Sequence, residues 1–341
     1  MKFEVFYQLQ TSNFQTFKQI IRIMEKPYVI GMDMGGTNTV FGVVDSRGNV
    51  VSKSAIKTGT HTDVNLYVQD LYDEMIKLIN AAGGSEKIKG IGVGAPNGNY
   101  YTGNIEFAPN LPWKGVIPFA KLMTEKFRIP TALTNDANAA AVGEMIYGGA
   151  RGMKNFIMIT LGTGVGSGII IDGKVVYGHD GFAGELGHTT AIRENGRLCG
   201  CGKHGCLETY CSATGVARSA REILGSTTKS SLLRNIPVDS ITSKDVFDAA
   251  MEGDEVAKEI FEYTGKILGQ SLADFVAFSA PEAIAIFGGL SKAGDLIMNP
   301  IREHMEANLL PLWKGKVKLF FSELKEADAA ILGASALAWE L

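Results

Sequence analysis

Two segments of this 341-residue sequence look like copies of one unit. Residues 35–45 read GGTNTVFGVVD and residues 163–172 read TGVGSGIIID, and an apolar run precedes each, at residues 28–33 and 155–160. An apolar run, a glycine-rich turn and a second apolar run predict a β-hairpin. Because this hairpin recurs in both halves of the chain, the sequence indicates an internal repeat and therefore a duplicated domain.

Strand and helix patterns alternate through the rest of each half, so each half is expected to be α/β. In the first half we expect strands at 50–56, 88–94 and 131–134, helices at 66–79, 118–127 and 137–147, and a loop at 96–113. In the second half we expect a glycine-rich turn at 161–168, a return strand at 169–172 and a loop at 182–207. A mostly helical region that includes 246–278 follows, and then come strands at 283–287 and 317–322 and a closing helix at 327–339.

Composition limits the classes of partner. The chain is 45% hydrophobic, enough for two domains with cores of their own. Its formal net charge is −3 and the charges are interspersed, so we expect no nucleic-acid or membrane-surface partner and favour a small neutral or anionic ligand. No apolar run approaches the ~20 residues of a membrane helix.

The first 26 residues lack the continuous apolar stretch and small-residue cleavage site of a secretory signal, so a cytoplasmic location is expected. Folded order is predicted to begin near Pro27. Met24 is therefore a candidate natural start, with residues 1–26 as an N-terminal extension.

The two glycine-rich turns are candidate phosphate sites. Adjacent glycines let the backbone approach an anion, and Thr37 and Asn38 add a hydroxyl and an amide. Neither turn has the lysine of a Walker A loop, and neither is followed by the helix of a dinucleotide fold. A plain hairpin turn is the alternative for the first. The second is denser in glycine than a strand favours, which indicates close approach of a ligand.

A cysteine-rich loop carries the most specific motif. His188, Cys199, Cys201 and Cys206 together offer one imidazole and three thiolates, a set that suits a closed tetrahedral zinc site with a structural role. His204 could replace His188, and Cys211 could replace a nearby thiol, although Cys211 is expected to be a buried helix residue. A reduced, metal-free loop is the remaining alternative.

The two hairpins and Gly288-Gly289 after a late strand are similar to the arrangement in the superfamily of sugar kinases, actin and heat-shock ATPases. The resemblance implies duplicated α/β domains with a nucleotide and sugar cleft between them. It implies contacts to ATP from Gly35, Gly36, Thr37, Asn38, Thr163, Gly164, Gly288 and Gly289. Asp33 would orient hydrated Mg²⁺; the alternative is that it caps the turn.

The loop motifs narrow the resemblance. Residues 185–188 read ELGH and residues 199–208 read CGCGKHGCLE, which resembles the ROK family of bacterial sugar kinases, repressors and uncharacterised open reading frames over residues 28–341. The resemblance implies zinc on His188, Cys199, Cys201 and Cys206. It implies a sugar site of Asn110, Asn135, Asp136, Glu185, His188 and Glu208, in which His188 uses a different ring nitrogen for each role.

Asp136 is the expected catalytic base. Phosphoryl transfer to a sugar needs a carboxylate near the attacking hydroxyl to accept its proton. The alternative is that Asp136 caps the helix that follows it, because Asn and Asp both cap well. The roles are compatible if Asn135 caps the helix and Asp136 faces the substrate.

The expected function is ATP-dependent phosphorylation of a free hexose in carbohydrate metabolism, with glucose first because no basic residue for an acidic sugar is evident. Mannose, allose, fructose, N-acetylglucosamine and N-acetylmannosamine stay open as substrates, and polyphosphate as donor. A sugar-responsive ROK repressor is the alternative of another class, although residues 1–26 are too short and apolar for a helix-turn-helix domain. The resemblance also implies a homodimer. Residues 27–147 with 325–341 are expected to form a small domain, and 148–324 a large domain with the zinc loop.

Overall fold

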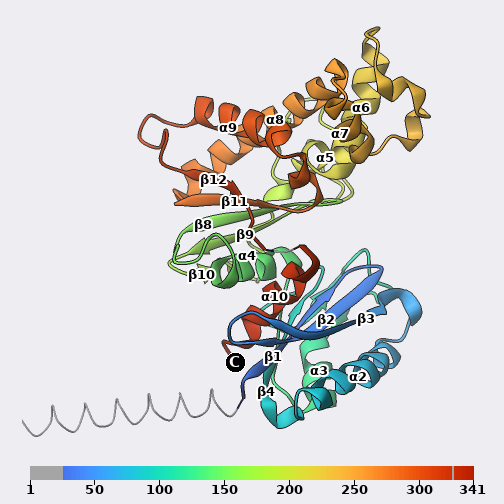
Figure 1. Ribbon diagram of the computed structural model, residues 1–341, viewed down its shortest axis with the longest axis vertical. Coiled ribbons are helices and arrows are strands. Elements are labelled where there is room, and N and C mark those ends of the chain that lie inside the picture. The colour runs from blue at the N-terminus through green and yellow to red at the C-terminus, as the bar shows by residue number, and fades with distance from the viewer. Residues whose placement is uncertain (1–25, 325) are drawn as a thin grey trace, which may run out of the picture. The chain divides into compact units, whose positions relative to one another are not determined.

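The computed structural model describes residues 26–324 and 326–341, so the proposed start at Met24 and almost all of the proposed extension lie outside the described residues. The chain divides into two compact units. One ends at Gly143 and resumes at Ala327, and the other runs from Glu144 to Glu326, so that the boundary falls inside helix α4 (Asp136–Tyr147). Each unit contains its own five-stranded mixed sheet (Figure 1).

The two sheets have the same topology. The first has the order β3-β2-β1-β4-β7 and the second β10-β9-β8-β11-β12. In each, three consecutive strands form an antiparallel meander, and two later strands add in parallel beside its first strand. The strands are β1 (Tyr28–Met34), β2 (Asn38–Asp45), β3 (Val50–Lys57), β4 (Ile88–Gly94), β7 (Thr131–Thr134), β8 (Phe156–Leu161), β9 (Val165–Ile171), β10 (Lys174–Val175), β11 (Ala283–Phe287) and β12 (Lys318–Phe321). The predicted α/β fold with an internal repeat is confirmed.

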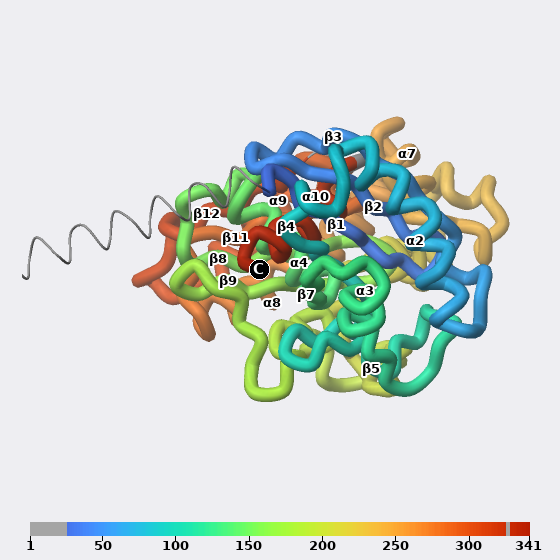
Figure 2. Tube along the Cα trace, turned by 90° about the horizontal axis from the view of Figure 1, so that it is seen from below, coloured from blue at the N-terminus to red at the C-terminus, as the bar shows by residue number. Residues whose placement is uncertain are grey.

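Helices cover both faces of the first sheet. The helices α2 (Val64–Ala81) and α3 (Phe119–Phe127) pack on the face that bears Ile30 and Met32. The helix α10 (Glu326–Ala338) packs on the other face, where Gly31 and Gly92 leave room for it (Figures 1 and 2). A Cβ atom on either glycine would lie 1.9 Å from a carbonyl oxygen of α10, so close packing requires glycine there.

In the second unit, one face of the sheet is buried by helices that follow the cysteine-rich loop. Ile159 and Ile286 from the sheet share one core with Leu268 and Leu272 from α8. These helices are α5 (Glu208–Cys211), α6 (Ala213–Ser226), α7 (Ser243–Met251), α8 (Glu255–Ser279) and α9 (Asp295–Asn308). The sheet and its helix layer therefore form one core, and α5 begins at Glu208, directly after the loop.

Three segments contain structure that the sequence patterns did not resolve. The turn expected at residues 161–168 is shorter, because β9 already begins at Val165 and its glycines pair with β8. The helical region expected at 246–278 is two helices, since Asp254 caps a new helix after Gly253. The loop at 96–113 contains β5 (Ile105–Glu106), which pairs with β6 (Val116–Ile117). Sequence periodicity does not detect such short pairings.

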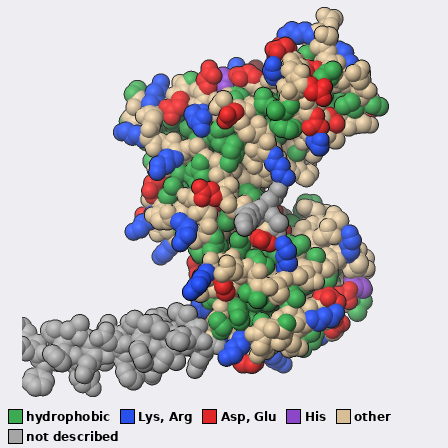
Figure 3. All heavy atoms as spheres, in the orientation of Figure 1, with side chains coloured by type: hydrophobic (Ala, Val, Ile, Leu, Met, Phe, Trp, Pro, Cys, Tyr) green, Lys and Arg blue, Asp and Glu red, His purple; other side chains and the backbone are tan. Residues whose placement is uncertain are grey.

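Acidic and basic side chains are interspersed on the face shown in Figure 3. None of the helices in the described part of the chain is both long enough and apolar enough to cross a membrane.

Candidate functional site

Two carboxylates lie at the carboxyl ends of β1 and β7, parallel strands on either side of β4 in the first unit. Asp33 is near the end of β1, Gly94 ends β4 beside it, and Asp136 follows β7. A Cβ atom on Gly94 would lie 3.6 Å from Asp33 Oδ1 and 3.5 Å from Asp136 Cα, so the glycine separates the two acids. Ligands of open α/β sheets bind at this edge, which makes the pair a candidate site.

The two acids are electrostatically unusual. Burial, and then the charge of Asp136, raise the pKa of Asp33 from 3.8 to about 7. Desolvation by the surrounding protein also raises the pKa of Asp136, although a hydrogen bond from the Ala137 N–H, at 2.8 Å, acts in the opposite direction. Paired carboxylates with raised pKa values attract a cation or hold a proton near neutral pH.

The helix cap is Asn135 rather than Asp136. Asn135 Oδ1 accepts a hydrogen bond from the N–H of Asn138 at 2.6 Å, and α4 begins at Asp136. Protein atoms surround Asp136 closely enough to raise its pKa, yet the residue keeps an exposed surface. Its carboxylate is therefore available for chemistry, as the sequence allowed.

The first glycine-rich turn lies against Asn110. The Gly35 N–H donates to the Asn38 carbonyl at 3.0 Å, which closes the turn, and Gly36, Thr37 and Asn38 are exposed. A Cβ atom on Gly36 would lie 2.9 Å from the Asn110 carbonyl oxygen. The structure therefore brings Asn110 next to the turn, which no local sequence pattern indicates.

The second glycine-rich turn consists of Gly162, Thr163 and Gly164, between β8 and β9. Gly288, at the end of β11, lies beside it, because a Cβ atom there would be 2.6 Å from the Leu161 carbonyl oxygen. Gly288 also has φ +104°, which favours glycine. The predicted turn and the late Gly288-Gly289 pair thus meet at one end of the second sheet.

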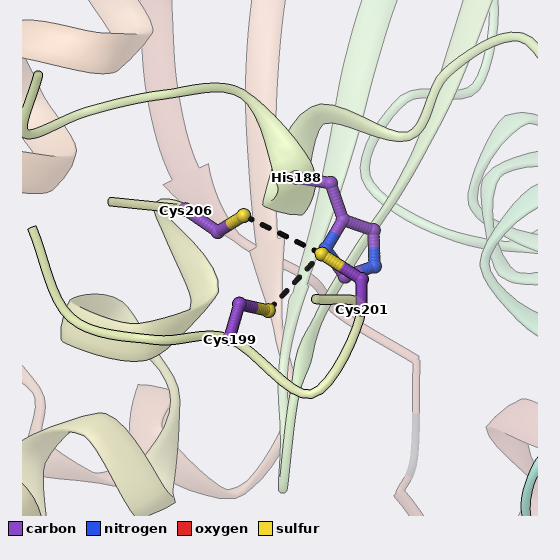
Figure 4. Close-up of side chains that lie close together, drawn as sticks. All are labelled: His188, Cys199, Cys201 and Cys206. Carbon is purple, nitrogen blue, oxygen red and sulfur yellow. Dashed lines mark hydrogen bonds between the residues drawn. The ribbon is translucent and has the colours of Figure 1, made fainter. Parts of the chain in front are cut away.

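The four predicted zinc ligands converge (Figure 4). The ligand atoms of His188, Cys199, Cys201 and Cys206 all lie within 4.8 Å of one another. Cys201 Sγ is 3.7 Å from Cys206 Sγ, and Cys199 Sγ is 3.7 Å from His188 Nδ1. Tetrahedral zinc with Zn–S bonds of about 2.3 Å needs sulfur atoms about 3.8 Å apart, so the residues fit the metal.

The neighbouring ligand alternatives have other partners. His204 Nδ1 contacts the Gly196 carbonyl at 3.0 Å, and Cys211 is fully buried at the end of α5 with its thiol on the Thr264 carbonyl. Among the cluster thiols, burial and then the nearby Cys201 and Cys206 raise the pKa of Cys199 to about 12. A bound dication reverses such a shift, because it stabilises the thiolate.

The cysteine-rich loop positions both predicted acidic sugar contacts. Glu185 precedes the short 3₁₀ helix Leu186–His188, and Glu208 begins α5 directly after the loop. Glu208 Oε2 accepts a hydrogen bond from the Val165 N–H at 3.0 Å, and Oε1 lies 3.7 Å from Cys199 Sγ. The loop, Glu208 and the second turn are therefore one connected structure.

Two residues that support the loop were not identified from the sequence. Buried Ser167 accepts from the Leu186 N–H at 3.1 Å and donates to the Gly184 carbonyl, which fixes the segment around Glu185 to β9. The Arg197 side chain is 5% exposed and donates to Glu222, to Ser219 and to the Thr209 carbonyl. These contacts join residues far apart in sequence, so no spacing signals them.

Known proteins resemble the chain over most of its length. A glucokinase of Halalkalibacterium halodurans is 38% identical over 313 residues, which cover 91% of this chain and 94% of that protein. A xylose repressor of Caldicellulosiruptor bescii is 30% identical over 311 residues, 91% of this chain and 77% of the repressor. A solved ROK family glucokinase from Streptomyces griseus, in complex with glucose and AMPPNP, is 32% identical with a TM-score of 0.75, covering 92% of this chain and 100% of that one.

Two units of one topology, each with a glycine-rich turn, define an α/β protein of the actin-like sugar kinase class. The cysteine-rich loop is specific to a smaller group. The sequence pattern of the ROK family matches residues 29–340, and the chain belongs to the ROK family.

Proposed function

We propose that the protein is an ATP-dependent hexose kinase that converts glucose to glucose 6-phosphate. The observation that carries the proposal is the pair Asp33 and Asp136, two acids with raised pKa values at the carboxyl ends of β1 and β7, on either side of β4. The pair occurs in a chain that is 38% identical to a glucokinase over nearly the full length of both proteins. The product would enter glycolysis.

Asp136 acts as the general base. A sugar hydroxyl attacks the γ-phosphorus of ATP, and a carboxylate within hydrogen-bond reach of that hydroxyl accepts its proton as the P–O bond forms. The raised pKa of Asp136 makes it a stronger base than an ordinary aspartate. Because Asn135 caps the helix, Asp136 is not needed as the cap.

The proposed nucleotide contacts are residues of the two glycine-rich turns and of the late Gly288-Gly289 pair. Gly35, Gly36, Thr37 and Asn38 of the first turn, and Thr163 and Gly164 of the second, contact the phosphates, whereas Gly288 and Gly289 contact adenosine. Asp33 would hold hydrated magnesium, which supplies positive charge to the phosphates when bound. The raised pKa of Asp33 supports this role, because a carboxylate without a cationic partner gains most from a bound cation.

The cysteine-rich loop serves the sugar. Zinc held by His188, Cys199, Cys201 and Cys206 would fix the loop, and the closed ligand set gives it a structural role. His188 places Nδ1 in the cluster, which leaves Nε2 for a sugar hydroxyl. Glu185, Glu208, Asn110 and Asn135 complete the sugar contacts.

A coupled kinase assay tests the proposal. Purified protein is assayed with ATP and Mg²⁺ over glucose, mannose, allose, fructose, N-acetylglucosamine and N-acetylmannosamine, with polyphosphate as a second donor. The highest kcat/KM is expected for glucose with ATP. Turnover with none of these sugars, in protein that retains zinc, would refute the kinase proposal.

A sugar-responsive repressor is the second candidate, because the C. bescii xylose repressor matches 91% of this chain at 30% identity. A gel-shift assay with and without sugar separates the two functions. The kinase is preferred, since the glucokinase match has the higher identity, 38% against 30%, and covers 94% of the glucokinase against 77% of the repressor. The protein is also proposed to form a homodimer, which light scattering checks.

A further inference from the structure

The second glycine-rich turn is held in place by a segment that follows the cysteine-rich loop, residues 208–214, here termed the supporting segment. The Ala213 N–H donates to the Gly162 carbonyl at 2.9 Å. The Thr214 hydroxyl donates to the Thr163 carbonyl at 2.8 Å, across 51 positions of sequence. Two successive carbonyls of the turn are therefore bound by the start of α6.

Glu208 makes the third link. Its Oε2 accepts the Val165 N–H at 3.0 Å, and a Cβ atom on Gly164 would lie only 2.2 Å from the same oxygen. The carboxylate thus packs directly against the turn, and any side chain at position 164 would displace it. One oxygen of Glu208 is committed to the turn.

The donor direction at Thr214 is fixed by its neighbours. Ser212 Oγ accepts the Gly215 N–H at 3.0 Å as the cap of α6, and it lies 2.9 Å from Thr214 Oγ1. Because the single hydroxyl proton of Thr214 points to the Thr163 carbonyl, Ser212 donates to Thr214. Thr214 is therefore held from one side while it binds the turn on the other.

Binding these carbonyls aims the N–H groups of the turn. In a trans peptide the C=O and the following N–H point in opposite directions, and no described peptide bond is cis. The carbonyls of Gly162 and Thr163 point to α6, so the N–H groups of Thr163 and Gly164 point away from it. Within the described residues neither N–H has a partner, and Thr163 is exposed. Two outward N–H groups at a glycine turn suit a phosphate oxygen.

We propose that Thr214 is a positioning residue for the nucleotide: it holds the second turn so that the N–H groups of Thr163 and Gly164 face the phosphates. Through Glu208, the same supporting segment joins this phosphate turn to the sugar contacts. The inference rests on the proposed function. It predicts that loss of the Thr214 hydroxyl weakens nucleotide binding without weakening glucose binding measured alone.

The test compares two variants at one position. Thr214→Val keeps the shape and removes the hydroxyl, whereas Thr214→Ser keeps the hydroxyl. The dissociation constants for AMPPNP with Mg²⁺ and for glucose alone are measured by calorimetry, and KM for ATP and for glucose by the coupled assay. One lost hydrogen bond predicts a nucleotide affinity about three- to tenfold weaker in Thr214→Val. Thr214→Ser should stay within about twofold of wild type.

A matched control removes an equivalent hydroxyl elsewhere in the same unit. Thr242 caps α7 through a capping box with Asp245 and makes no contact with the turn. Thr242→Val should lower the melting temperature without altering AMPPNP affinity. Melting curves and zinc content of the Thr214 variants show whether the fold and the loop are intact.

The outcomes separate the inference from the proposed function. If wild type binds AMPPNP but Thr214→Val binds it equally well, the inference is wrong and the kinase proposal stands. Equal weakening of glucose and nucleotide, or no rescue by Thr214→Ser, also refutes it, because these results indicate general damage. If wild type neither binds AMPPNP nor phosphorylates a sugar, both proposals fall.

Discussion

Replacing Asp33 with asparagine should stabilise the protein at neutral pH and abolish its activity. Asp33 has a pKa of about 7 in the folded chain, against 3.8 for the free side chain. Between about pH 3.8 and pH 7, Asp33 is protonated in more folded molecules than unfolded ones. The free energy of unfolding therefore falls as pH rises through this range. The asparagine side chain of the Asp33→Asn variant cannot ionise, so this variant should lack the decline.

The size of the effect follows from the pKa. A pKa about 3 above the ordinary value corresponds to about 4 kcal/mol of lost stability once Asp33 is fully ionised, at 1.36 kcal/mol for each pH unit. Asp33 is only half-buried, so solvent screening reduces this ceiling, to roughly half. The free energy of unfolding of Asp33→Asn is therefore expected to exceed that of wild type by about 2 kcal/mol at pH 8 and by almost nothing at pH 4.

Denaturation of protein freed of magnesium and nucleotide, at pH 4, 5, 6, 7 and 8, measures this difference. Asp45→Asn is the control with the opposite sign. Burial alone would raise the pKa of Asp45, but hydrogen bonds from Asn49 and Arg47 lower it. The Asp45 carboxylate therefore stabilises the folded state above its unfolded pKa, and this stabilisation is lost in acid. Asp45→Asn should destabilise at neutral pH.

The activity assay completes the test. Asp33→Asn should lose kinase activity in spite of its higher stability, because it removes the proposed magnesium contact. A variant that is less stable than wild type at pH 8, or a stability difference that does not grow with pH, would refute the electrostatic reasoning. Full activity in a stabilised variant would refute only the magnesium role.

Three further predictions concern other parts of the chain. Asp136→Asn should lower kcat by about 10²–10⁴ with unchanged melting temperature and zinc content, and near wild-type turnover would remove Asp136 as the base. Metal analysis should find zinc in wild type and in Cys211→Ser but not in Cys201→Ser; equal zinc in the two variants would disprove the ligand set. Gly92→Ala should destabilise the protein by about 1–3 kcal/mol or more, since its Cβ would lie 1.9 Å from the α10 backbone. Gly59→Ala, whose Cβ would have no atom within 4 Å, should change stability by under about 0.5 kcal/mol. Chemical denaturation measures both, and equal effects would contradict the packing argument.

Local patterns predicted most of the elements. The apolar runs before the two glycine-rich turns became β1 and β8, and the predicted strands at 88–94, 131–134 and 283–287 match the observed bounds. The region at 246–278 is mostly helical, as predicted, but periodicity did not show the break at Gly253 between α7 and α8. The length of the second turn was misjudged because glycines inside β9 resemble turn glycines in sequence.

By itself, the sequence determined the duplicated α/β fold, and it predicted a zinc site at His188, Cys199, Cys201 and Cys206, four residues of one loop whose ligand atoms lie close together in the structure. Only the tertiary structure decided which distant residues meet. The strand order places Asp33 and Asp136 at strand ends on either side of β4, and the packing of α6 brings Thr214 to the second turn. The physical reason is that spacing along a chain fixes geometry over a few residues, whereas contacts over 40 or 50 positions depend on sheet order and on how helices pack.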